Sequence, residues 1–194
     1  MNRILSSVAL AFICLFPVYG QMAWNAKYQN YFNQYKDLAI EQMLKYRIPA
    51  SITLAQGVFE SGAGYSDLAR NGNNHFGIKC HGWQGRKTYH DDDARDECFR
   101  AYDSPGQSYE DHSKFLVQSQ RYRRLFSLKI TDYKGWAHGL KACGYATNPA
   151  YAKKLIDIIE LYKLYKYDSA HGYDKFMAKH ASEDSPALNG GTLH

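Results

Sequence analysis

The sequence lacks most of the features that would assign a function directly. Its 24 Lys and Arg residues outnumber its 19 Asp and Glu residues, which gives a formal net charge of +5. The basic residues form no extended run, which is typical of a solvated surface rather than of a nucleic-acid-binding patch. The chain has no His-Glu-x-x-His zinc motif and no glycine-rich loop that would hold a phosphate. We therefore expect no nucleic-acid partner, no metal, no cofactor, and a monomer with one compact domain.

A single stretch of the sequence is long and apolar, and it lies at the N-terminus. Arg3 precedes an uncharged apolar run at residues 4–16, and Val18 and Gly20 are small residues at positions −3 and −1 of a cut after residue 20. This order is typical of a secretory signal peptide, and the run is too short for a membrane span. We predict that residues 1–20 are a signal peptide and that the mature protein is periplasmic or secreted. A retained N-terminal anchor is the alternative.

Three of the four cysteines lie outside the predicted signal peptide. In an oxidising compartment two of them are expected to form a disulfide. Cys80 and Cys98 flank a segment with the pattern of a hairpin, so we predict a bridge between them. Cys143 lies in a helical pattern and is expected to be buried and free. A zinc site built from Cys80, Cys98, His81 and His90 is the competing interpretation, although its spacing matches no common zinc motif.

Hydrophobic periodicity predicts that the first part of the domain is helical. Apolar and aromatic positions recur at helical spacing from residue 28 to residue 46. The mostly apolar run at 51–59 predicts a buried helix that begins at Pro49 and ends at Gly62 and Gly64. A short helical turn at 66–72 then leads toward the first cysteine of the pair.

A β-hairpin and further helices are predicted in the rest of the domain. Glycines near residue 82 and acidic residues near residue 92 favour a small exposed hairpin between the cysteines. Four helical segments follow, with candidate N-caps at Ser104, Asp132 and Asn148. Residues 21–167 are therefore expected to form one α+β domain that is mostly helical. Residues 168–194 have few apolar positions, so we predict a disordered tail.

Glu60 is the first candidate for chemistry, because it ends an apolar helix. Desolvation by neighbours such as Phe59 and the partial negative charge of a helix C-terminus both favour the protonated carboxyl. A carboxyl that stays protonated near neutral pH is suited to general acid catalysis of glycoside cleavage. The residues alone leave a second interpretation open, in which Glu60 is held by hydrogen bonds to nearby backbone amides.

Glycosidases commonly use a second carboxylate, and the sequence offers a cluster of them. Asp91, Asp92 and Asp93 lie in the predicted hairpin, where alternate residues share a face, so Asp92 points away from its two neighbours. The same cluster is typical of a polar hairpin tip or a cation site. Glu97 is a further candidate, but its position beside Cys98 favours a structural role.

Several amide and aromatic side chains are candidates for binding sugars. Each is also common in packing or turns when considered alone. No nucleophilic triad is evident, and the helical, apolar setting of Cys143 argues for an inert thiol rather than a peptidase nucleophile. The candidate substrate-binding residues are Asn73, Asn74, Phe76, Tyr102, Tyr145 and Tyr151.

Four motifs in this order resemble family 73 of the glycoside hydrolases, the bacterial glucosaminidases found in autolysins and in the wall-cutting domain of flagellar rod-cap proteins. The first motif resembles the catalytic helix of that family; alone it would also fit lytic transglycosylases and goose-type lysozymes. The match covers residues 30–165, nearly the whole mature domain. The motifs are residues 48–64 (IPASITLAQGVFESGAG), 73–79 (NNHFGIK), 99–104 (FRAYDS) and 144–155 (GYATNPAYAKKL).

The resemblance implies a lysozyme-like α+β fold, with a helical lobe, a small β-lobe and a cleft between them. It implies hydrolysis of the β-1,4 bond after N-acetylglucosamine in peptidoglycan, with Glu60 as the general acid. Tyr145 corresponds to a tyrosine that lines the cleft near the reacting sugar. The family takes its second carboxylate from the hairpin, and we choose Asp92, with Asp91 and Asp93 as its neighbours. Assistance by the substrate N-acetyl group is the alternative to a second carboxylate.

Two other functions are compatible with these motifs. One is a wall-binding module that no longer cuts. The other is a muramidase or lytic transglycosylase activity on the same fold.

Overall fold

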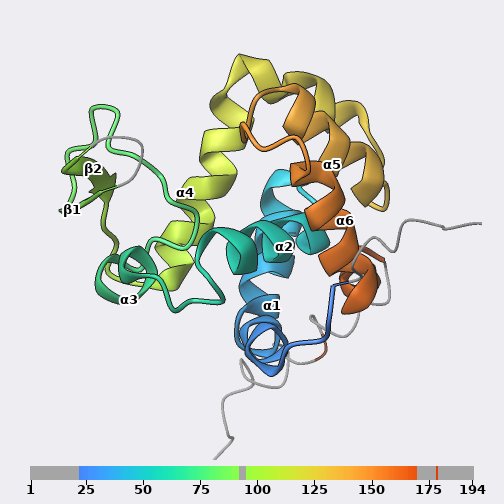
Figure 1. Ribbon diagram of the computed structural model, residues 1–194. Helices are drawn as coiled ribbons and strands as arrows, with labels where there is room; N and C mark the ends of the chain where they lie inside the picture. Colours follow the sequence, from blue (N-terminus) through green and yellow to red (C-terminus); the bar gives the residue numbers. More distant parts are fainter. Residues whose placement is uncertain (1–21, 92–94, 170–177, 179–194) are drawn as a thin grey trace, which may run out of the picture.

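The computed structural model describes residues 22–91, 95–169 and 178, and shows a helical body with a small hairpin at one side (Figure 1). The predicted signal peptide, Asp92 and nearly all of the predicted tail lie outside the described residues. None of the helices within the described part of the chain is both long and apolar enough to span a membrane.

The first helix, α1 (Ala26–Tyr46), confirms the predicted amphipathic segment. Asn25 caps it, because the side-chain oxygen of Asn25 accepts a hydrogen bond of 2.8 Å from the backbone N–H of Lys27. Arg47 ends the helix in the left-handed conformation. The buried face of α1 includes Tyr31 and Phe32, so the tyrosines of this helix contribute to the core rather than to an open sugar groove.

The second helix, α2 (Ala50–Glu60), lies at the centre of the fold and is buried along residues 50–58. Pro49 precedes the helix as its cap residue rather than forming its first turn, and its side chain offers no cap to the free N–H groups. The missing cap comes from the far end of the domain. The carboxylate of Asp168 accepts hydrogen bonds from the backbone N–H of Ser51 at 2.8 Å and from the Ser51 hydroxyl at 2.5 Å. Asp168, where the predicted tail begins, therefore belongs to the packed domain.

The predicted hairpin is present as two short antiparallel strands, β1 (Lys87–His90) and β2 (Glu97–Arg100). Helix α3 (Asp67–Gly72) packs beside it. A disulfide joins Cys80 to Cys98, which confirms the predicted pairing and leaves neither sulfur available as a zinc ligand. Phe99 of β2 is buried, so one face of this small sheet is covered rather than open to solvent.

Of the remaining helices, those at residues 133–142, 151–161 and 164–168 pack on α2, whereas the helix at 105–118 packs on α1 (Figure 1). Ser104 and Asp132 cap their helices as predicted, whereas the side chain of Asn148 bonds the N–H of Ala150 and the final long helix begins two residues later than expected. Cys143 is free, as predicted, but half-buried rather than buried. The elements are α4 (Pro105–Gln118), the 3-10 helix η1 (Gln120–Ser127), α5 (Tyr133–Ala142), α6 (Tyr151–Leu161) and the 3-10 helix η2 (Leu164–Asp168).

Candidate active site

A cavity of about 670 Å³ contains the candidate acid. One wall comes from the loop after α3 and from the hairpin, and it includes Phe76, Lys79 and His90. The opposite wall comes from the α4–η1 junction and the loop after α5, and it includes Arg121 and Tyr145. Residues from the hairpin side and from the helical body therefore line one cavity, as the family resemblance implies for a cleft between two lobes.

Glu60 lies at the edge of this cavity as the last residue of α2. Its side chain is partly buried, and its Oε1 accepts a hydrogen bond of 3.1 Å from the Tyr151 hydroxyl. The same hydroxyl accepts a hydrogen bond of 3.0 Å from the side-chain amide of Gln56, one turn earlier in α2. This relay from Gln56 through Tyr151 orients the carboxyl group toward the cavity wall.

Two stacked tyrosines form the wall beside the acid. The rings of Tyr145 and Tyr151 lie 5.7 Å apart and nearly parallel, with an angle of 22° between their planes. Burial raises the pKa of both hydroxyls, and the charge of Glu60 raises them further. Both hydroxyls therefore stay protonated and keep a hydrogen to donate, to Glu60 or to a ligand.

The turn after Glu60 brings bare backbone close to the acid. Gly62, Ala63 and Gly64 all have positive φ, of 56°, 62° and 82°. The Ser61 side chain holds this turn, because its hydroxyl donates to the Gly57 carbonyl at 2.5 Å and accepts from the Gly64 N–H at 2.8 Å. Left-handed conformations cost a residue such as Ala63 about 1 kcal/mol, so packing maintains this turn beside the acid.

A buried polar chain supports the floor of the site. The Tyr109 hydroxyl donates to the Tyr31 hydroxyl at 2.9 Å, and the Tyr31 hydroxyl lies 3.0 Å from Nδ1 of His75. A Cβ on Gly57 would lie 2.5 Å from the Tyr31 oxygen, so only glycine allows α2 to approach α1 this closely. Burial lowers the pKa of His75 to about 4, which keeps the ring neutral at pH 7. These hydrogen bonds thereby tie the loop after α3 to α1 and α4.

The predicted sugar-binding residues fall into two groups. Phe76 and Tyr145 line the cavity, and Tyr151 contacts Glu60 directly. Asn73, Asn74 and Tyr102 do not line it. Instead, the Asn74 side chain is buried and bonds the backbone of the loop and of β2, and the Asn73 amide donates to the Tyr102 carbonyl at 3.0 Å. Their polar groups hold the loop against the hairpin. Local sequence patterns do not distinguish this structural role from sugar binding.

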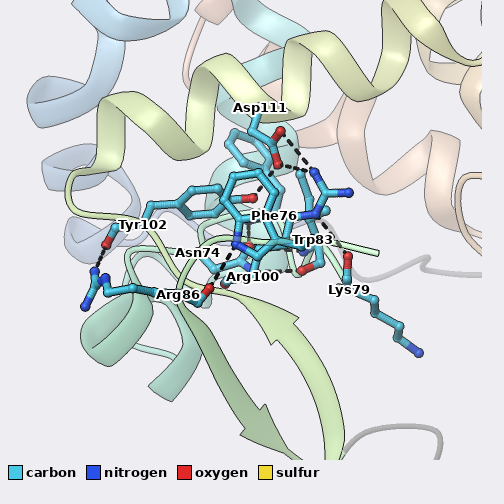
Figure 2. A network of polar contacts seen from close by, with 9 residues as sticks. Asn74, Phe76, Lys79, Trp83, Arg86, Arg100, Tyr102 and Asp111 are labelled. Carbon is cyan, nitrogen blue, oxygen red and sulfur yellow. Dashed lines mark hydrogen bonds and ion pairs between the residues drawn. The ribbon is translucent and has the colours of Figure 1, made fainter. Parts of the chain in front are cut away.

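A clamp between the hairpin and α4 was not foreseen from the sequence (Figure 2). Nη1 of Arg100 in β2 donates to both carboxylate oxygens of Asp111 in α4, at 3.1 and 2.9 Å. The Tyr102 hydroxyl donates to the same carboxylate at 2.6 Å, and the Arg100 guanidinium lies 4.9 Å from the centre of the Trp83 ring. This clamp therefore holds β2 and the chain that follows it against α4.

Of the three aspartates considered for the second carboxylate, the structure describes Asp91. Asp92 lies outside the described residues. Asp91 is exposed at the end of β1, where its carboxylate accepts a hydrogen bond of 2.8 Å from the N–H of Asp96. Within the described ranges, Glu60 is the one carboxylate that lines the cavity. The choice of Asp92 therefore remains a prediction.

A comparison with known protein families decides the classification. The family described as mannosyl-glycoprotein endo-beta-N-acetylglucosaminidase, the Glucosaminidase family, matches residues 36–164. The chain belongs to this family. The matched region runs from within α1 to the start of η2, so Glu60 and all the residues that line the cavity lie within it.

Individual relatives agree with this classification. The chain is 33% identical over 157 residues to the exo-glucosaminidase LytG of Bacillus subtilis, which covers 74% of this chain and 55% of LytG. It is 29% identical over 142 residues to the peptidoglycan hydrolase FlgJ of Vibrio parahaemolyticus, covering 67% of this chain and 46% of FlgJ. The chain thus spans about half the length of these curated relatives.

Solved structures of the family share the fold. The catalytic domain of the autolysin Auto from Listeria monocytogenes has a TM-score of 0.61 and 27% identity, covering 76% of this chain and 91% of that one. The glycoside hydrolase domain of Salmonella typhimurium FlgJ has a TM-score of 0.61 and 25% identity, covering 78% of this chain and 98% of that one. These matches confirm the predicted lysozyme-like α+β fold.

Proposed function

We propose that this glucosaminidase domain hydrolyses the β-1,4 bond after N-acetylglucosamine in peptidoglycan, outside the cytoplasm. The observation that carries the proposal is the position of Glu60, which ends the buried helix α2 at the edge of the cavity and accepts a hydrogen bond from Tyr151. The family membership and the names of the relatives, which include peptidoglycan hydrolases, support the same substrate.

In the proposed reaction Glu60 donates its proton to the glycosidic oxygen as the bond to the sugar carbon breaks. The departing sugar keeps the bond electrons and that proton, and positive charge develops on the N-acetylglucosamine ring. A water molecule then bonds to the ring carbon, and its proton passes to the second carboxylate, for which we propose Asp92. If the hairpin supplies no carboxylate within reach, the carbonyl oxygen of the substrate N-acetyl group bonds to the ring carbon as the departing sugar leaves. Water then displaces that oxygen from the ring carbon, and the proton from water passes to the Glu60 carboxylate.

The sugar at the new reducing end identifies the reaction. Purified cell wall is digested, the fragments are reduced with borohydride, and the reduced sugar is identified by mass spectrometry. Reduced glucosamine is expected. Reduced muramic acid would identify a muramidase, and anhydro-muramic ends would identify a lytic transglycosylase. Tight binding to the wall with no new ends would identify a non-cutting module.

Glu60→Gln tests the acid within the same assay. Because general acid catalysis contributes about 10²–10⁴-fold to rate, kcat is expected to fall by that range without loss of the fold. Glu41→Gln is the matched control, since Glu41 is on the surface of α1 and pairs with Lys45 at 2.5 Å. Wild-type turnover by Glu60→Gln would refute the assignment.

Single Asp→Asn changes at 91, 92 and 93 test the partner. Loss of turnover at Asp92 alone supports the proposal, whereas full turnover by all three variants supports assistance by the N-acetyl group.

The length of the first products shows whether the enzyme cuts inside the glycan or at its end. The family name describes an endo enzyme, whereas LytG is named an exo enzyme. Long soluble fragments are expected first.

A further inference from the structure

The two basic side chains that line the cavity differ in whether a carboxylate pairs with them. Apart from Glu60, the charged residues of the described lining are Lys79 on one wall and Arg121 on the other. The charge of Lys79 is offset by Glu97, whose carboxylate lies 2.9 Å from the ammonium nitrogen. Arg121 has no carboxylate of the described residues within ion-pair distance. The wall formed by η1 therefore presents a positive charge to whatever occupies the cavity.

Packing holds the Arg121 guanidinium at this wall. Its central carbon lies 4.8 Å from the centre of the Tyr122 ring and 6.0 Å from that of Phe115, both of which line the same cavity. Stacking on aromatic rings satisfies the face of a guanidinium but leaves its N–H groups at the edge available. Those N–H groups form a planar fork that matches the two oxygens of a carboxylate.

A row of aromatic rings connects Arg121 to the acid. Tyr122 lies 6.2 Å from Tyr145, ring centre to ring centre, and Tyr145 lies 5.7 Å from Tyr151, whose hydroxyl bonds Glu60. Tyr122 and Tyr151 are buried, so these rings set the positions of Arg121 and Glu60 rather than offering an open surface to a sugar. Both Arg121 and Glu60 line the same cavity. A glycan that occupies this cavity with its scissile bond at Glu60 therefore places a neighbouring sugar near Arg121.

We propose that Arg121 is a specificity-determining residue that binds a carboxylate on the muramyl branch of the glycan. This inference rests on the proposed function. In peptidoglycan every second sugar carries a lactyl group, with either a free carboxylate or a peptide that bears carboxylates, whereas a plain polymer of N-acetylglucosamine carries none. Arg121 thus makes the site select an acidic glycan over a neutral one.

Binding to a non-cutting variant tests this inference separately from catalysis. The ligand is a peptidoglycan tetrasaccharide with free lactyl carboxylates, compared with the same glycan after conversion of its carboxylates to methylamides. A second pair of ligands carries the stem peptides, with and without the same conversion. Calorimetry with Glu60→Gln is expected to give about tenfold weaker binding for the neutral member of at least one pair, since charge-assisted hydrogen bonds are among the strong ones. The pair that responds identifies the lactyl or the peptide carboxylate as the ligand.

Arg121→Ala, added to Glu60→Gln, is expected to abolish this discrimination by weakening only the acidic ligand. Arg121→Lys is expected to restore part of it, because the charge returns without the planar fork. Arg123→Ala is the matched control, since Arg123 is exposed in the same 3-10 helix but does not line the cavity.

Equal binding of acidic and neutral ligands before Arg121 is changed would overturn the inference, as would an equal loss of both ligands in Arg121→Ala. If Arg121 discriminates between the acidic and neutral ligands but the protein with Glu60 intact releases no reducing ends from cell wall, the proposed function is refuted. This inference would then still stand.

Discussion

His112 provides a quantitative test of how the core beneath the site responds to pH. Its ring is fully buried in α4 and stacks on Phe76, with ring centres 3.9 Å apart and 13° between the planes. Neither ring nitrogen has a hydrogen-bond partner among the described residues. Burial lowers the pKa of His112 from 6.5 to about 3. The folded protein therefore holds a neutral histidine under conditions in which the unfolded chain binds a proton.

The sign and size of the effect follow from proton linkage. Between pH 6.5 and pH 4 the unfolded state binds about one more proton at His112 than the folded state, so the free energy of unfolding falls as the pH falls. Each pH unit within this window is equivalent to about 1.4 kcal/mol, which gives a loss of about 3 kcal/mol by pH 4. Above pH 6.5 the contribution is fully present.

His112→Phe is expected to remove this pH dependence while keeping the ring that packs on Phe76. It also eliminates two unpaired polar atoms, each of which costs about 1–3 kcal/mol when buried. Urea unfolding of both proteins at pH 7, 5.5 and 4, followed by fluorescence of the buried Trp136, measures the difference. The stability advantage of His112→Phe should grow by about 3 kcal/mol from pH 7 to pH 4.

His138→Phe serves as the control, because His138 is exposed on α5 and should leave the pH profile of the wild-type protein unchanged. If the unfolding free energies of the wild type and His112→Phe fall in parallel as the pH is lowered, His112 is not buried in the neutral form and the reasoning is wrong.

Three further predictions concern the caps and contacts around the site. Asp168→Ala removes the cap of α2 and should lower the free energy of unfolding by about 1–2 kcal/mol in urea titrations. Asp111→Asn breaks the pair with Arg100 and should destabilise the protein by about 2 kcal/mol, with earlier hydrogen exchange in the hairpin than in α2. Tyr151→Phe removes the hydroxyl that donates to Glu60 and should lower kcat by about tenfold with little change in KM; an unchanged kcat would show that this bond does not serve catalysis.

Local patterns along the chain were enough to predict most of the elements. The buried α2 ends at Glu60 because an apolar run is followed by glycines that adopt positive φ. The hairpin and the Cys80–Cys98 bridge follow from turn residues between two cysteines in a chain that the sequence predicts to be exported. These features depend on residues a few positions apart, so the sequence alone carries the necessary information.

Local patterns failed where one side chain had two possible partners. Asn74 and Tyr102 have the chemistry of sugar-binding residues, but the fold buries both and uses them to join the loop to the hairpin and α4. Asn148 has the chemistry of an N-cap, but it forms a turn of its own before α6 begins. In each case the competing partner is a nearby backbone or side-chain group whose approach depends on packing.

The sequence by itself determined the helical body, the bridged hairpin and the placement of Glu60 at the end of an apolar helix. The tertiary structure decided what surrounds that carboxyl group. Tyr151 reaches Glu60 across 91 positions of sequence, and Asp168 reaches the start of α2 across 117. Contacts between residues this far apart are specified by how whole elements pack, and no periodicity or spacing within one element encodes them.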